Sequence, residues 1–233
     1  MSSFAHNAAV ILVHGAWADG SCWQNVILPL RREGLEILCA PIPLTSLAED
    51  IAFVQRAIEK TSGPVLLAGH AYAGAVIAGA KDLRVKSLVY VAALAPAEGE
   101  TVADVFYRAR PHPEAPHLEP DADGLIWMPE GYFARAVAHK ASADQTTILE
   151  AVQRPIAMAC IQEKAPAPTW ETTPSWYLLA EEDRMIAPET QRFMAERMGA
   201  TIRAHDVDHS PMHTEPGVLL GVILEAARET LAC

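Results

Sequence analysis

Six short apolar segments constrain the fold of this chain more than any other feature. Each is apolar along its whole length, without polar alternation, and stretches with helical periodicity separate them. Continuous apolar character indicates strands that are covered on both faces, as in a parallel sheet with crossover helices. The sequence therefore predicts an α/β fold, with a mostly parallel, doubly wound sheet of about six strands. The predicted strands are 9–13, 35–40, 65–68, 87–92, 176–180 and 200–204.

Helix boundary signals agree with this arrangement. Ser46 and Glu49 have the spacing of a capping box, which predicts a helix that begins after Ser46. Pro188 suits a first helical turn and Gly199 a C-terminal cap, so a helix is expected between them.

Length and proline content bound the domain organisation. A chain of 233 residues, about half of them apolar, can bury one full core, so we expect a single domain over 1–233. No strand is predicted between about residue 94 and residue 174. Prolines such as Pro111 and Pro166 interrupt the amphipathic stretches of this segment. We interpret 94–174 as a helical cap insertion over the sheet.

Charge excludes two classes of partner. Eighteen basic and 29 acidic side chains give a formal charge of −11, which repels nucleic acid and anionic membrane surfaces. The N-terminus lacks the pattern of a signal peptide, and no apolar run is long enough to span a bilayer. We therefore expect a cytoplasmic protein whose partner is a small molecule, without nucleic acid or membrane. The apolar run 218–224 is either core or the surface of a possible homodimer.

The segment 64–77 has a special local pattern. It predicts a buried strand, a sharp turn and a helix, which is the context of a G-x-S-x-G nucleophile elbow. The elbow here contains Gly69, His70, Ala71, Tyr72 and Ala73, so the nucleophile position holds an alanine and the second glycine has gained a methyl group. Conventional serine chemistry is therefore not expected at Ala71.

The other two members of a triad have candidates in the usual chain order. Asp183 follows the predicted strand 176–180, and His209 follows the last predicted strand. A carboxylate that fixes the tautomer of an imidazole makes that imidazole a general base. We therefore assign the catalytic positions to Ala71, Asp183 and His209, the alternative for His209 being a relic that only bonds within its loop.

Backbone amides complete the predicted site. A His-Gly turn ends the first strand, so the amide of Ala16 is expected opposite the amide of Tyr72 at the start of the elbow helix. Two such donors form an oxyanion hole, whose stabilisation of developing charge is worth several kcal/mol. The loss of a side-chain hydroxyl does not remove them.

The chain resembles bacterial α/β-hydrolases of the small esterase group that includes plant methyl-ester esterases and hydroxynitrile lyases. The resemblance implies an α/β-hydrolase fold in which Ala71 stands where the family has its serine. Two origins are open: a natural variant, which the accompanying change at Ala73 favours, or a substitution that inactivates the enzyme. The matching segments are 14–17 with Trp23, 69–74, 88–92, Asp183 with 191–194, and His209.

Aromatic side chains suggest a substrate pocket. Trp17 follows the His-Gly turn, and Trp127, Tyr132 and Phe133 lie in the predicted cap. We assign all four to substrate binding, although ordinary packing of the cap also explains such residues.

Other polar residues are candidates for different chemistry. His205, His209 and His213 are spaced by four, but they lie in a strand-to-loop passage where this spacing does not align side chains, so no metal is expected. Ser21 and Cys22 are the nearest replacement nucleophiles, although no strained turn presents them. The four cysteines are scattered, and neither a P-loop nor a G-x-G-x-x-G motif follows the first strand, so we expect no cofactor.

Three functions follow from these residues. The first is an enzyme that acts on a small apolar ester, lactone or related carbonyl compound through His209, Asp183 and the amide pair. The second is a lyase-type acid/base catalyst on a carbonyl compound, and the third is a non-catalytic protein that binds a small molecule.

Overall fold

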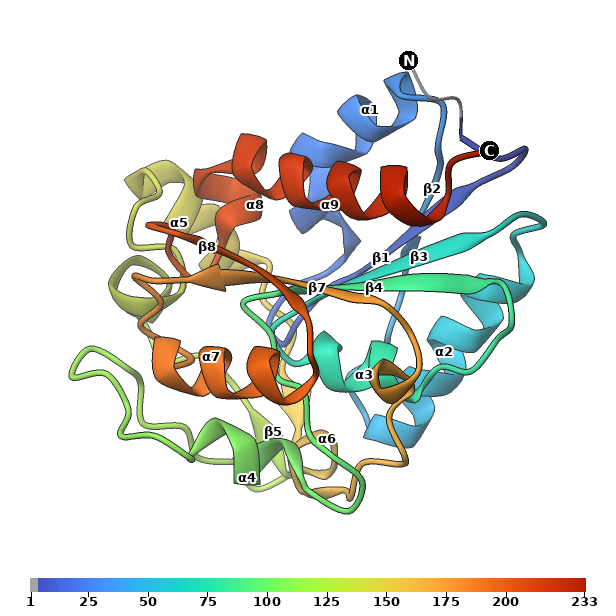
Figure 1. Ribbon diagram of the computed structural model, residues 1–233. Helices are drawn as coiled ribbons and strands as arrows, with labels where there is room; N and C mark the ends of the chain where they lie inside the picture. The colour runs from blue at the N-terminus through green and yellow to red at the C-terminus, as the bar shows by residue number, and fades with distance from the viewer. Residues whose placement is uncertain (1–3) are drawn as a thin grey trace.

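The computed structural model describes residues 4–233, and its centre is one parallel sheet of six strands (Figure 1). The strand order is β2-β1-β3-β4-β7-β8, and every neighbouring pair is parallel. The predicted α/β class and all six predicted strands are confirmed, and no strand end differs from its prediction by more than two residues. The strands are β1 (Ala9–Val13), β2 (Glu36–Ala40), β3 (Val65–His70), β4 (Val85–Val91), β7 (Ser175–Ala180) and β8 (Thr201–His205).

Burial of the strands follows their place in the sheet. Every residue of β1, β3 and β7 is buried, whereas the edge strands β2 and β8 keep partly or fully exposed positions. Crossover connections place helices on both faces, so the central strands meet apolar side chains on either side. Burial on both faces therefore explains why the strand segments are apolar along their whole length.

Helices form one layer on each face of the sheet. In Figure 1, α1 and α9 lie above the sheet, and α2, α3 and α7 lie below it. The apolar run 218–224 belongs to α9, and four of its side chains are buried in the core between α9 and the sheet, so most of this run is core. The helices are α1 (Gln24–Arg32), α2 (Leu47–Glu59), α3 (Ala73–Gly79), α7 (Pro188–Arg197), α8 (Pro211–Thr214) and α9 (Pro216–Thr230), with a 3₁₀ turn η1 (Gly20–Trp23) before α1.

Two helix boundary predictions have different outcomes. Pro188 begins α7, and Gly199 follows its end with a φ of +63°, as predicted. The hydroxyl of Ser46 accepts from the amide of Glu49 at 3.1 Å, but the Glu49 carboxylate binds the Thr45 hydroxyl instead of returning to Ser46. The reciprocal half of the predicted capping box was therefore wrong, because the Thr45 hydroxyl binds the Glu49 carboxylate.

The segment 94–174 contains only short elements. Some of its residues line the same cavity as residues that follow β1, β3, β7 and β8, so the segment covers the carboxyl-end edge of the sheet. Its elements are α4 (Val102–Phe106), β5 (Leu125–Ile126), η2 (Phe133–Val137), α5 (Ala143–Ala151), β6 (Ile156–Ala157), α6 (Met158–Gln162) and η3 (Thr169–Glu171).

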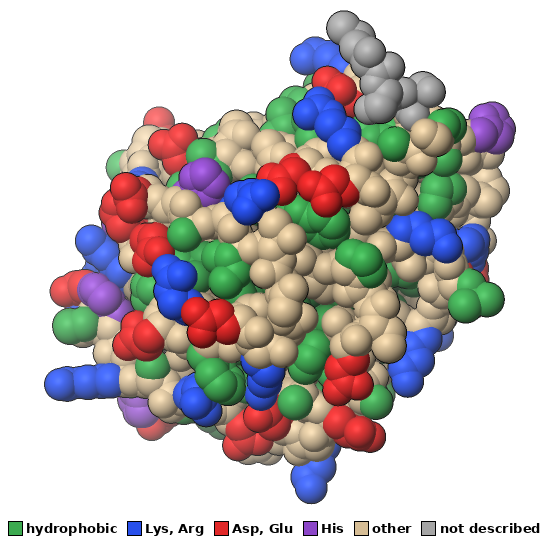
Figure 2. All heavy atoms as spheres, viewed as in Figure 1, with side chains coloured by type: hydrophobic (Ala, Val, Ile, Leu, Met, Phe, Trp, Pro, Cys, Tyr) green, Lys and Arg blue, Asp and Glu red, His purple; other side chains and the backbone are tan. Residues whose placement is uncertain are grey.

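The surface carries charge of both signs. On the face drawn in Figure 2, acidic and basic side chains are interspersed among apolar ones. Among residues 4–233, none of the helices combines the length and the apolar character that a membrane span requires.

Candidate active site

The elbow keeps a strained backbone although it holds no serine. Ala71 lies between β3 and α3 with a φ of +50°, a left-handed conformation that costs a residue with a side chain about 1–2 kcal/mol. Backbone hydrogen bonds hold it: its amide donates to Val91, and its carbonyl accepts from Leu94 at 2.9 Å. A Cβ at Gly74 would lie 2.4 Å from the Leu94 carbonyl oxygen, so only glycine allows this approach. The surroundings therefore dictate the elbow conformation, whichever residue occupies it.

The structure brings His209 and Asp183 together. Nδ1 of His209 lies 2.7 Å from Oδ2 of Asp183, and both side chains are almost fully buried. Asp183 follows β7 and His209 follows β8, which is the neighbouring strand, so the two loops meet at one edge of the sheet.

The orientation of Asp183 is fixed by further donors. Its Oδ1 accepts from the amides of Met185 at 2.7 Å and Ile186 at 2.9 Å, and its Oδ2 also accepts from Gln191 Nε2 at 2.8 Å. These donors hold the carboxyl group of Asp183 in one orientation. A carboxylate held this way keeps the proton of His209 on Nδ1.

The other nitrogen of His209 is the chemically available one. His209 lines the cavity, and within residues 4–233 no group forms a hydrogen bond with its Nε2. In the neutral ring, a proton on Nδ1 leaves Nε2 as an acceptor. The arrangement can therefore take a proton from a molecule in the cavity.

The two predicted amide donors lie beside the same cavity. Ala16 and Tyr72 both line it, and in the described chain neither amide has a backbone or side-chain acceptor. A Cβ at Gly15 would lie 3.0 Å from the His70 carbonyl oxygen and 3.1 Å from the Ala71 methyl group. A side chain at this position would crowd the elbow, so glycine suits the close approach of the turn after β1.

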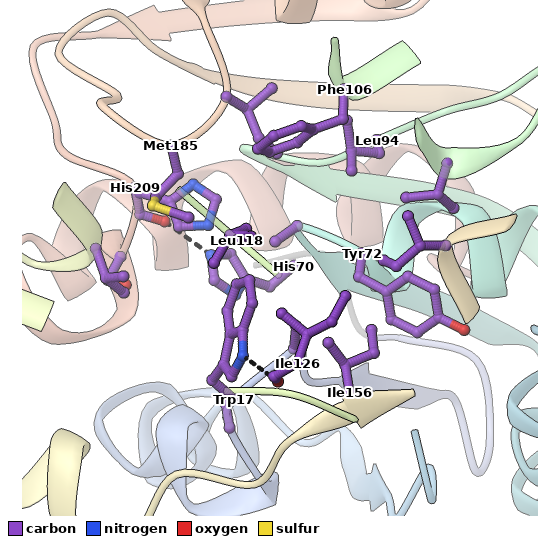
Figure 3. Close-up of a pocket in the computed structure, with 18 of the residues that line it drawn as sticks. Trp17, His70, Tyr72, Leu94, Phe106, Leu118, Ile126, Ile156, Met185 and His209 are labelled. Carbon is purple, nitrogen blue, oxygen red and sulfur yellow. Dashed lines mark hydrogen bonds between the residues drawn. The ribbon is translucent and has the colours of Figure 1, made fainter. Parts of the chain in front are cut away.

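The cavity is small and largely apolar, with a volume of about 260 Å³. Figure 3 shows Trp17, His70, Tyr72 and His209 around it, together with apolar side chains. Its wall combines the elbow, the loops after β1, β7 and β8, and the segment 94–174. Such a wall suits an apolar molecule that has one polar group at the His209 end. The apolar side chains labelled in Figure 3 are Leu94, Phe106, Leu118, Ile126, Ile156 and Met185.

Two of the four aromatic assignments place a side chain at the cavity. Trp17 and Phe133 line it, and the indole of Trp17 donates to the Ile126 carbonyl at 3.0 Å. Trp127 does not line the cavity: its side chain is 47% exposed and its indole donates to Asp121. Neighbouring residues of an extended segment face opposite sides, and Ile126 takes the side that faces the cavity.

Tyr132 does not line the cavity either. Its ring packs under the guanidinium of Arg135, which lies 4.6 Å from the ring centroid. The aromatic composition of a cap does not distinguish such surface packing from pocket walls.

His70 also belongs to the site. It lines the cavity, and its Nε2 donates to the main-chain oxygen of His209 at 2.7 Å. Burial lowers the pKa of His70 well below its usual value, so the ring is neutral. His70 thereby braces the backbone that carries His209.

The other candidate polar residues differ in whether they line the cavity. Cys22 lines the cavity, but burial raises the pKa of its thiol well above the usual value, which disfavours a thiolate. Ser21 is exposed and does not line the cavity. His213 does line it, a position that the sequence reasoning missed because the residue was considered only as a metal ligand.

The three evenly spaced histidines do not converge. His205 ends β8, His209 pairs with Asp183, and His213 lies on α8. In the part of the chain that the structure describes, no three histidine, cysteine or acidic side chains are grouped to hold a metal ion.

The pH dependence of stability tests the burial of His14. Burial lowers its pKa from 6.5 to about 4, so below pH 6.5 the unfolded chain binds a proton that the folded chain does not. We expect the free energy of unfolding to fall as pH drops from about 6.5 to about 4, by up to about 1.4 kcal/mol per pH unit for each such proton. Denaturant titration of His14→Gln should give a shallower pH slope than the unmodified chain. The control is His117→Gln at an exposed site, and equal slopes for His14→Gln and the unmodified chain would contradict the assignment.

Comparisons with known proteins agree with the fold. A carbendazim hydrolyzing esterase of Nocardioides sp. (strain SG-4G) is 30% identical over 121 residues, which are 45% of this chain and 49% of that protein. The match thus spans about half the length of this relative.

Solved structures match over nearly the whole chain. A pyrethroid hydrolase from Sphingobium faniae JZ-2 has a TM-score of 0.82 at 20% identity, covering 94% of this chain and 97% of that one. An extracellular α/β-hydrolase from a Paenibacillus species has a TM-score of 0.80 at 22% identity, covering 95% and 99%. At these identities the likeness establishes the fold. Residues 10–221 match the family model of the alpha/beta hydrolase family, and the chain belongs to this family.

Proposed function

We propose that this protein hydrolyses a small, largely apolar ester, lactone or related carbonyl compound without forming an acyl-serine intermediate. The observation that carries the proposal is the contact of 2.7 Å between His209 Nδ1 and Asp183 Oδ2, with Nε2 left to an apolar cavity. The amides of Ala16 and Tyr72, which have no acceptor among residues 4–233, line the same cavity and supply the complementary donors.

In the proposed reaction, water replaces the serine hydroxyl. The carbonyl oxygen of the substrate accepts from the amides of Ala16 and Tyr72, and a water molecule attacks the carbonyl carbon while His209 Nε2 takes its proton. The carbonyl then re-forms, the bond to the leaving oxygen breaks, and His209 returns the proton to that oxygen. The products are a carboxylic acid and an alcohol, and Asp183 stabilises the transient imidazolium.

Slow turnover is the expected cost of this chemistry. Hydrolases that lose a triad member keep about 10³–10⁴-fold acceleration over the uncatalysed reaction, from the oxyanion hole and binding alone. The strained φ of Ala71 supports a use for the elbow, because this conformation presents the Tyr72 amide.

The names of the relatives support ester hydrolysis. They include a carbendazim hydrolyzing esterase and a pyrethroid hydrolase. We further propose that residues 94–174 act as a cap within one hydrolase domain over 1–233, because residues of this segment enclose the cavity.

A second candidate is a non-catalytic protein that binds a small carbonyl compound. The methyl group of Ala71, where the family chemistry needs a hydroxyl, favours it. The donors that fix Asp183 favour catalysis, because a pure binder gains less from an oriented imidazole.

The test compares the unmodified protein with His209→Ala on p-nitrophenyl acetate and p-nitrophenyl butyrate. We expect hydrolysis above the buffer rate in the unmodified protein and a lower rate in His209→Ala, which keeps the amide pair and the cavity but removes the base that activates water. His205→Ala is the matched control, since His205 ends β8 nearby and does not line the cavity. Equal rates in all three proteins would refute water activation by His209, and saturable binding without turnover would favour the second candidate.

A further inference from the structure

A buried carboxylate on α2 is not used by the proposed reaction. Asp50 has no exposed surface and is surrounded by the apolar core between the sheet and α2. Burial raises the pKa of its carboxyl group, which expresses the cost of placing charge there. A position of this kind usually holds an apolar residue, so the presence of a carboxylate there needs an explanation.

The contacts of Asp50 join three separate parts of the chain. Its Oδ1 accepts from the amide of Leu44 at 2.8 Å. Its Oδ2 accepts from the hydroxyl of Tyr72 at 2.7 Å and from the thiol of Cys160 at 3.6 Å. Tyr72 and Cys160 are themselves buried, so solvent does not weaken these bonds.

Each of the three partners is connected to the wall of the cavity. Tyr72 lines it and follows Ala71 at the elbow. Cys160 lies in α6, where Met158 and Ile161 line the cavity on either side of it. Leu44 has a φ of +63°, and its carbonyl oxygen accepts from the amide of Ala157 in β6 at 2.9 Å. Asp50 therefore links the elbow to the cap segment that faces it.

We propose that Asp50 is a positioning residue, which acts through Tyr72 to hold one of the two amide donors and to align α6 against the elbow. A tyrosine fixed only by its backbone can tilt with the first turn of α3. When its hydroxyl is also bound to a buried carboxylate, both ends of the residue are held, and the amide keeps one direction toward the cavity. The role of the amide rests on the proposed function, whereas the positioning itself does not.

The first test observes the amide directly. In ¹H–¹⁵N spectra, Asp50→Asn and Tyr72→Phe should each shift the backbone amide signal of position 72. The change in chemical shift should be several-fold larger than the median change for residues of the sheet. Tyr90→Phe is the matched control, because Tyr90 is fully buried and its hydroxyl has no partner among residues 4–233. This variant removes a buried hydroxyl without breaking a hydrogen bond, so the amide signal of Tyr72 should keep its chemical shift.

The second test measures catalysis in the Ala71→Ser background with p-nitrophenyl acetate. Adding Tyr72→Phe should lower kcat by about tenfold with KM nearly unchanged, since a misdirected oxyanion donor acts mainly on the transition state. A purely structural role would lower the melting temperature and leave kcat at the level of the Tyr90→Phe control.

The two tests separate the two ideas. An unmoved Tyr72 signal, with kcat at the control level, would overturn the positioning role of Asp50 whatever the chain catalyses. A displaced Tyr72 signal in an Ala71→Ser protein without activity would support positioning and count against the proposed function. If Asp50→Asn does not fold, Tyr72→Phe decides alone, because it removes a single hydroxyl group.

Discussion

Ala71→Ser should raise the hydrolysis of short-chain aryl esters by about 10³-fold or more, because it supplies the one missing member of a unit whose parts act together. The elbow backbone already has the left-handed conformation that presents a nucleophile, and Ala71 and His209 line the same cavity. Serine differs from alanine by one hydroxyl, so the backbone has no reason to rearrange. Initial rates with p-nitrophenyl acetate measure the gain.

Two controls make this expectation specific. The double variant Ala71→Ser with His209→Ala should lose the gain, since the new hydroxyl would have no base. Ala71→Gly should give no gain, since it changes the backbone freedom without adding a hydroxyl. Mass spectrometry of the Ala71→Ser protein should detect an acetyl adduct during turnover. A folded Ala71→Ser protein that gains nothing would mean that the elbow does not present the side chain to His209.

The pairing of Asp183 with His209 could be predicted because topology determines it. In a parallel sheet the carboxyl ends of all strands lie at one edge, so residues that follow neighbouring strands meet, however far apart they are in sequence. The same reasoning predicts that Ala16 and Tyr72 lie close together, and both residues line the cavity. Continuous apolar segments likewise predict strands, because burial on both faces leaves that pattern.

The walls of the cavity could not be predicted in the same way. Trp127 and Ile126 are neighbours of similar character, and only the pairing of the short strand β5 decides which of them faces inward. Asp50 was also missed, because its amphipathic helix is typical of a surface helix and acidic side chains on such helices are usually solvated. Its partners lie 6, 22 and 110 residues away, distances at which a sequence pattern carries no information about contact.

Asp183→Asn in the Ala71→Ser background should lower kcat by about 10⁴-fold, because it forces His209 into the wrong tautomer. Two backbone amides donate to Oδ1 of Asp183, so an asparagine would keep its oxygen there and place its NH₂ group at the Oδ2 site. That group would donate a hydrogen bond to Nδ1 of His209, so Nδ1 would have to be unprotonated and the ring proton would lie on Nε2. An imidazole that is protonated at Nε2 cannot act as the base.

The side chain of Gln191 cannot adapt freely to an asparagine at position 183. Its Nε2 donates to Oδ2 of Asp183, so in the variant it would face the new NH₂ group. Rotating the side-chain amide of Gln191 would relieve this clash between two donors. The rotation would cost two further bonds, because Gln191 Oε1 accepts from the amide of Ala180 and Nε2 donates to the carbonyl of Ile186. The control is Asp206→Asn, an exposed carboxylate in the same loop as His209, which should leave kcat unchanged. Imidazole ¹⁵N shifts report the tautomer, and a variant that keeps both the Nδ1–H tautomer and its rate would mean that His209 does not depend on Asp183 for orientation.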